Sequence, residues 1–175
     1  CGREAFPVET PLLVSGRRIS SELERLGRSL GLKPIATAGI LGANEEIAPP
    51  LKPGSAVATV FAQGDYTAVA IGTVTWVDGQ RFLAFGHPVS NRGAVDYPAA
   101  GVFIHRVIAN LDIPFKLGVP LNQVGRFVQD RGAGASGVKN EAADTVLVKA
   151  VVQDKTTGRK KTYQTAVVRE ATLLR

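Results

Sequence analysis

A mainly β fold with one short helix is predicted by three features of the 175-residue sequence. Glycine and proline are frequent, with 19 and 10 residues. Stretches rich in valine, alanine, threonine and isoleucine are separated by turn residues, and only one short stretch has helical periodicity. This combination is typical of short strands joined by tight turns. We therefore expect a β-barrel or sandwich of about seven or eight strands.

The N-terminal part, residues 1–49, is predicted to be an extended segment followed by the helix. Two prolines keep residues 1–20 extended. Residues 21–24, Ser-Glu-Leu-Glu, fit a capping box in which Ser21 is the N-cap. The leucines of this amphipathic stretch share one face, and a glycine follows that can end it: Leu23, Leu26, Leu30 and Gly31.

Residues 33–54 read as a loop, and its proline-rich end at 49–54 is the best internal boundary. Residues 50–175 are then the β-barrel part of what we expect to be one domain. Strands are predicted at 55–62 and 66–77. Because Asp78-Gly79 fits a two-residue type I′ turn, 73–85 is predicted to be a hairpin.

The C-terminal half continues the β pattern. Residues 101–109 and 124–130 are predicted strands, whereas the glycine-rich stretch 131–140 reads as a loop. A closing hairpin is expected from 145–153 to 162–168.

The net charge, the single cysteine and the lack of methionine restrict which partners and which chain start are expected. The formal net charge is +6, but the charges are scattered and aromatic residues make up 6%. We therefore do not expect nucleic-acid binding, although electrostatic binding of an anion is a weaker third hypothesis. A single cysteine excludes an internal disulfide. Since the chain has no methionine, we expect a fragment, and Cys1 is a lipid-modified residue, a nucleophile freed by self-cleavage, or simply the first residue.

His87 is the main candidate for catalysis. It follows the 73–85 hairpin between Gly86 and Pro88, so it is presented at the end of a strand, as a general base would be. The alternative is a turn histidine bonded to nearby backbone. His105 has apolar neighbours and is better explained as a strand residue.

A histidine base needs a nucleophile and an orienting carboxylate. Ser136 lies in the glycine-rich stretch, where backbone amides could form an oxyanion hole, but a plain loop is the alternative. Asp96 and Asp130 are candidate orienting carboxylates, and Asp78 is already explained by its turn. No metal or cofactor is expected, because metal-ligand spacings and phosphate-binding loops are lacking.

The block at 70–88, AIGTVTWVDGQRFLAFGHP, resembles the SpoIVB-type serine peptidase family, named for the stage IV sporulation protein B of spore-forming bacteria. The segments 53–57, 63–65 and 125–131 are similar to other parts of that family. The resemblance covers about residues 50–137.

The resemblance implies a trypsin-like β-barrel fold, whole or in part, and a serine endopeptidase that works at or outside a bacterial membrane. His87 would be its general base, and a protein or peptide its substrate. The family's serine motif is missing, and Ser136 is only a partial echo of it. The nucleophile is therefore expected outside these residues. Alternatively, the domain is an inactive β module that binds an envelope or membrane-associated protein.

Overall fold

The computed structural model describes residues 9–37, 47–109, 111 and 113–170, and these form one helix and ten strands. The helix is α1 (Ser21–Ser29). The strands are β1 (Thr10–Ser15), β2 (Leu32–Thr37), β3 (Ala56–Gly64), β4 (Ala68–Asp78), β5 (Arg81–Ala84), β6 (Gly93–Ile108), β7 (Phe115–Arg131), β8 (Gly134–Lys139), β9 (Thr145–Gln153) and β10 (Lys160–Val168). The mainly β prediction is confirmed, with more strands than expected.

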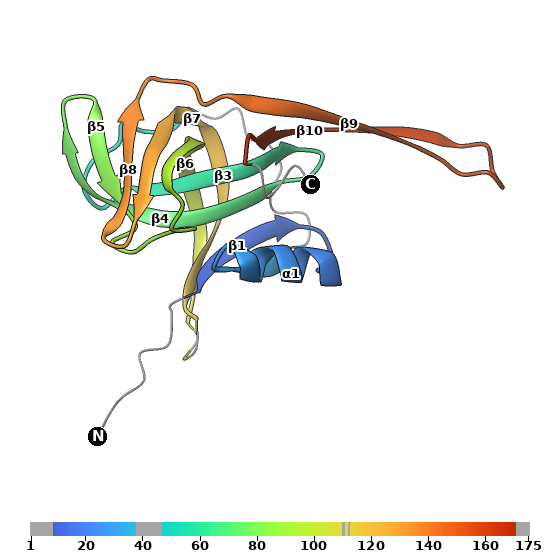
Figure 1. Cartoon of the computed structure of the whole chain (residues 1–175), viewed down its shortest axis with the longest axis horizontal. Helices are drawn as coiled ribbons and strands as arrows, with labels where there is room; N and C mark the ends of the chain where they lie inside the picture. The colour runs from blue at the N-terminus through green and yellow to red at the C-terminus, as the bar shows by residue number, and fades with distance from the viewer. Residues whose placement is uncertain (1–8, 38–46, 110, 112, 171–175) are drawn as a thin grey trace.

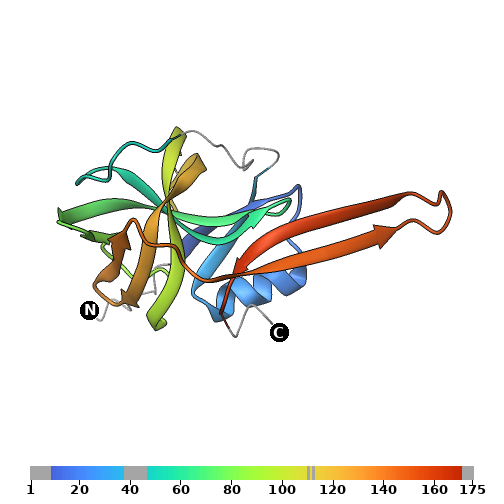
Figure 2. The ribbon, with the colours of Figure 1, turned by 90° about the horizontal axis from the view of Figure 1, so that it is seen from above.

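The strands form one sheet in the order β2-β1-β4-β5-β8-β7-β6-β3-β10-β9. Because β3 also pairs with β4, six strands make a ring of pairings: β3, β4, β5, β8, β7 and β6. Register shifts interrupt the long β6–β7 pairing, and such bulges bend strands enough to curve a sheet. The ring stands at one end of the molecule, with β1 and α1 beside it and β9 and β10 projecting away (Figures 1 and 2).

Apolar side chains fill both faces of the ring strands. Neighbouring residues such as Val57 and Ala58 belong to different core clusters, because successive side chains of a strand point to opposite faces. One cluster includes the edge-to-face pair Phe82 and Phe127, with ring centroids 5.2 Å apart. The other includes Leu13 of β1, so this N-terminal strand helps cover the ring. β1 therefore joins the ring directly, because it pairs with β4.

The helix prediction is confirmed, although its first turn differs. Ser20, not Ser21, is the N-cap, and its Oγ accepts a hydrogen bond from the Leu23 amide at 3.2 Å. Gly31 ends the helix with a φ of 68°, a left-handed conformation that glycine adopts without strain.

Two segments predicted to be loops are strands. Residues 32–37 form β2, which runs parallel to β1 and accommodates Pro34 at the edge of the sheet. Residues 134–139 form β8, between β5 and β7. Its glycines permit close packing, since a Cβ at Gly137 would lie 2.2 Å from the Phe82 ring. Residues 38–46 of the predicted 33–54 loop, like Cys1 and Pro7, lie outside the described residues.

The 73–85 hairpin is confirmed, but its turn lies one residue later. Asp78 pairs with Arg81 at the end of the strands, so Gly79 and Gln80 form the turn. Of these two turn residues, only Gly79 has a positive φ, at 51°, whereas both central residues of a type I′ turn need one. The closing hairpin is confirmed as β9 and β10.

Candidate functional site

The backbone turns sharply just before His87. After β5, Phe85 and Gly86 both have φ of 74°, in the left-handed region. A phenylalanine rarely adopts this conformation, and such residues cluster at functional sites, where the surroundings must hold them in place. The Phe85 amide donates to the Thr73 carbonyl at 3.0 Å, which fixes the start of the turn. His87 is therefore presented by a constrained segment.

The ring of Phe85 supports the imidazole. It packs edge-to-face against both His87 and Phe127, with each pair of ring centroids 5.8 Å apart. Gly72 allows this position, because a Cβ there would lie 2.5 Å from the Phe85 ring. A side chain at Gly72 would displace Phe85 and, through it, His87.

The hydrogen bonds of His87 define its tautomer. Its Nδ1 lies 2.8 Å from the Pro88 carbonyl oxygen, which can only accept, so Nδ1 carries a hydrogen. The Thr10 hydroxyl donates to the same carbonyl at 3.2 Å and lies 3.5 Å from Nδ1. In the neutral ring Nε2 then keeps its lone pair. The imidazole can accept a proton at that atom, with a backbone carbonyl in the place that a carboxylate takes in a catalytic triad.

His87 lines an open cavity of about 250 Å³. The walls come from β1, β4, the Phe85–His87 turn, the end of β6 and the start of β7. Lys116 is the other ionisable residue of the lining, and its amine donates to the Thr73 hydroxyl and, at 3.5 Å, to the Gly72 carbonyl. Partial burial lowers the pKa of Lys116. The cavity thus combines a proton acceptor, a cation and apolar walls, the mixture of groups that is typical of ligand sites.

Asp130 holds the segment that follows His87. Its carboxylate is 1% exposed and accepts bonds from the amides of Val89, Ser90 and Asn91 at 2.6–2.9 Å. It also accepts from the Ser90 hydroxyl at 2.8 Å. Asp130 was a candidate for orienting the imidazole; in the structure it orders the loop that carries the imidazole instead.

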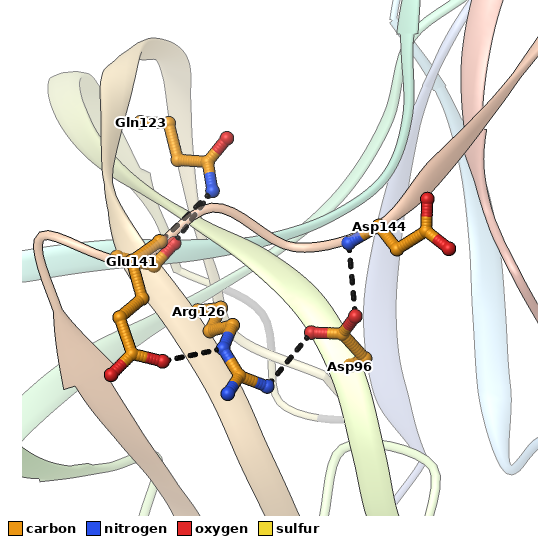
Figure 3. Close-up of polar contacts among 6 residues, drawn as sticks. Asp96, Gln123, Arg126, Glu141 and Asp144 are labelled. Atoms are coloured by element: carbon orange, nitrogen blue, oxygen red, sulfur yellow. Dashed lines mark hydrogen bonds and ion pairs between the residues drawn. The ribbon is translucent and has the colours of Figure 1, made fainter.

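The other two candidate residues lie elsewhere. Ser136 is on β8, opposite Leu83 of β5, and so shares the outer face of the sheet with that exposed side chain. Asp96 accepts from Arg126 at 3.1 Å and from the Asp144 amide at 2.9 Å, in a surface cluster (Figure 3). Among the described residues, neither forms a hydrogen bond with His87.

The Asp96 cluster braces the connection between β8 and β9. Arg126 bridges Asp96 and Glu141, whose carboxylate accepts from Nε at 2.9 Å (Figure 3). Gln123 donates to the Glu141 carbonyl at 3.3 Å. These contacts give Asp96 a structural role at the base of the projecting hairpin.

The sequence does not predict that Thr10 and Lys116 line the site of His87. Thr10 lies 77 residues before His87, and no local signal links the two. Lys116 could have been noticed as a lone cation between Phe115 and Leu117. His105 is confirmed as a strand residue, but it is exposed, with its ring 5.1 Å from that of Phe103.

Comparison of this chain with protein families, with curated proteins and with solved structures finds no match. Within the described ranges, no cluster of three or more histidine, cysteine or carboxylate side chains could hold a metal ion. In the same part of the chain, no helix has the length and apolar character needed to cross a membrane.

Tyr97 supplies a pH-dependent test of the network behind the site. Its hydroxyl donates to Glu170 at 3.1 Å and lies 3.4 Å from the Ser90 hydroxyl. Burial, with a smaller effect of the Glu170 charge, raises the pKa of Tyr97 from 10.0 to about 12. Between these values the unfolded chain loses the phenol proton while the folded chain retains it. The free energy of unfolding should therefore fall as the pH rises, by up to about 2–3 kcal/mol from this group.

Urea unfolding at several pH values from 9 to 12 measures this effect. The fall should be smaller for Tyr97→Phe than for the unmodified chain, and unchanged for Tyr163→Phe, which removes an exposed phenol. Equal slopes for Tyr97→Phe and the unmodified chain would show that Tyr97 titrates alike in both states.

Proposed function

We propose that this chain is the histidine-bearing part of a serine endopeptidase of the SpoIVB type, with a trypsin-like barrel. His87 is the general base, and the nucleophilic serine comes from a segment outside these 175 residues. The substrate is a protein or peptide, and the enzyme works at or outside a bacterial membrane. The observation that carries the proposal is the presentation of His87 at an open cavity with Nδ1 bonded to a carbonyl.

The chemistry follows from that tautomer. The serine hydroxyl attacks the peptide carbonyl while Nε2 of His87 takes its proton, and the imidazolium then protonates the leaving amine. Pro88 accepts from Nδ1 throughout and keeps the ring in orientation. Water attacks the acyl-enzyme in the second half of the reaction, with His87 again as the base.

A second function is favoured by a specific observation. The hydroxyl that contacts His87 among the described residues belongs to Thr10, which is 2% exposed and already donates to Pro88. A buried threonine is poorly placed to attack a substrate. The alternative is therefore an inactive β module of the same fold that binds a protein partner in the cell envelope.

Fluorophosphonate labelling of the full-length protein that contains these residues separates the two functions. The probe reacts with an activated serine, and mass spectrometry of the labelled peptide identifies it. A labelled serine outside this chain, together with hydrolysis of a fluorescent casein substrate, would support the peptidase. Labelling of Ser136 would move the nucleophile into this chain. Absence of both labelling and hydrolysis would favour the inactive binding module.

A further inference from the structure

The projecting hairpin has little support from the rest of the protein. We call β9, β10 and the 154–159 turn between them the arm (Figures 1 and 2). Only the base of β10, at 165–167, pairs with β3. Beyond this base, the two strands of the arm pair only with each other. An isolated two-stranded ribbon is at best marginally stable in water, so the arm gains most from a further strand.

The arm exposes apolar side chains along its length. Five large ones are between 38% and 65% exposed: Leu147, Val148, Val151, Val152 and Tyr163. Val148 and Val152 lie on one face of β9, and Tyr163 shares that face because its register partner is Ala150. Leu147 and Val151 point to the opposite face, since successive side chains of a strand alternate. Contiguous exposed apolar surface on a protein marks a site of interaction.

The backbone of β9 has an open edge. The Gln164 carbonyl accepts from the Asp65 amide at 2.9 Å, so Gln164 directs its backbone groups away from β9. Lys149 lies opposite Gln164 and therefore directs its own N–H and C=O away from β10. By alternation Val151 does the same. In the part of the chain that the structure describes, β9 is the last strand of the sheet, and no strand covers this edge.

The charge of the arm selects the kind of partner. It carries five basic residues, Lys149, Lys155, Arg159, Lys160 and Lys161, and one acidic residue, Asp154. The Asp154 carboxylate accepts from Thr156 and Thr157 within the turn. Among the described residues, none of the five cations forms an ion pair. Two such arms would repel each other edge to edge, so a second copy of the chain is a poor occupant.

We propose that the arm is a docking site for an acidic polypeptide segment, which binds in extended conformation as an additional strand on the open edge of β9. Backbone hydrogen bonds to the odd-numbered residues of β9 hold the strand. Acidic side chains lie on the face of Lys149 and Lys160, and apolar ones lie beside Val148 and Val152 on the other face. This site does not depend on catalysis at His87.

A labelled twelve-residue peptide of alternating glutamate and valine is the probe, and fluorescence polarisation with the whole chain measures its binding. Lys149→Glu and Lys160→Glu should each weaken binding by about tenfold, which corresponds to ~1.4 kcal/mol. Lys52→Glu reverses an exposed charge off the arm and should leave binding unchanged. The same peptide with lysine in place of glutamate should not bind. Equal binding of both peptides would overturn the charge argument.

The edge is tested separately from the charges. Val151→Pro removes an outward-facing N–H but no β9–β10 bond, whereas Val151→Thr keeps that N–H. Circular dichroism shows whether each variant keeps its strands. Proline should abolish peptide binding and threonine should retain it; equal binding by the two would overturn strand addition.

Other occupants give distinct results. Tighter binding of a DNA oligonucleotide or heparin than of the acidic peptide, lost in the same lysine variants, would overturn the polypeptide proposal. Peptide-independent dimers in sedimentation that disappear with Val151→Pro would identify a second copy instead. His87→Ala should leave peptide binding unchanged, so failure of the peptidase proposal is distinguishable from failure of this one.

Discussion

Under the peptidase function proposed above, replacement of His87 by alanine is expected to lower kcat/KM for peptide hydrolysis by the full-length protein by about 10²–10⁴-fold. The alanine variant lacks the Nε2 acceptor, so the proton of the proposed nucleophilic serine would have no base to receive it. The fold should persist, because His87 is only partly buried and its hydrogen bonds go to its neighbour Pro88 and to Thr10. The measurement is hydrolysis of a fluorogenic peptide, with the thermal midpoint recorded in parallel.

His105→Ala is the matched control, since it removes the other imidazole from an exposed position on β6. Its kcat/KM should stay within about twofold of that of the unmodified protein, as for an exposed surface substitution. Full activity of His87→Ala would assign the base to another residue. A large loss of thermal stability in His87→Ala would instead give the imidazole a structural role.

Replacement of Asp130 by alanine is expected to reduce the free energy of unfolding by about 3–5 kcal/mol. The carboxylate is buried and accepts four hydrogen bonds, three of them from backbone amides. Without it, the buried amides of Val89 and Ser90 lose their acceptor. The measurement is urea unfolding followed by tryptophan fluorescence.

Asp96→Ala is the control for this change, because Asp96 also accepts two hydrogen bonds but lies at the surface with a side chain 40% exposed. It should cost at most about 1 kcal/mol. Ser90→Ala removes one of the four hydrogen bonds to Asp130 and should reduce the free energy of unfolding by about 1 kcal/mol. This milder variant tests the same network if Asp130→Ala does not fold. Equal losses of unfolding free energy in Asp130→Ala and Asp96→Ala would show that the buried network adds no stability beyond that of a surface cluster.

Local patterns predicted local structure well. The leucines of α1, the turn residues near Gly79 and the alternation in β9 each act within a few residues, and each predicted element forms. The errors occur where tertiary contacts override local preference. β2 contains Pro34 yet is held against β1, and the glycines of β8 serve close packing rather than flexibility.

The candidate site was predictable only in part. Gly-His-Pro after a hairpin was visible in the sequence, and it does lie at a cavity. Its partners were not visible, because Thr10 reaches His87 across 77 residues and Asp130 reaches the same loop from the far end of β7. Both contacts depend on the order of strands in the sheet, which no local spacing encodes.

The ring of strands also bears on how the chain folds. β5 and β8 pair residues more than 50 positions apart, from Arg81 with Val138 to Ala84 with Ala135. A contact of this range carries a large loop-closure entropy, and proteins rich in such contacts fold in about milliseconds to seconds. A hairpin such as β9–β10 needs only about 1–10 μs to form. We therefore expect closure of the ring to limit the folding rate, and the pocket around His87 to form only after that step.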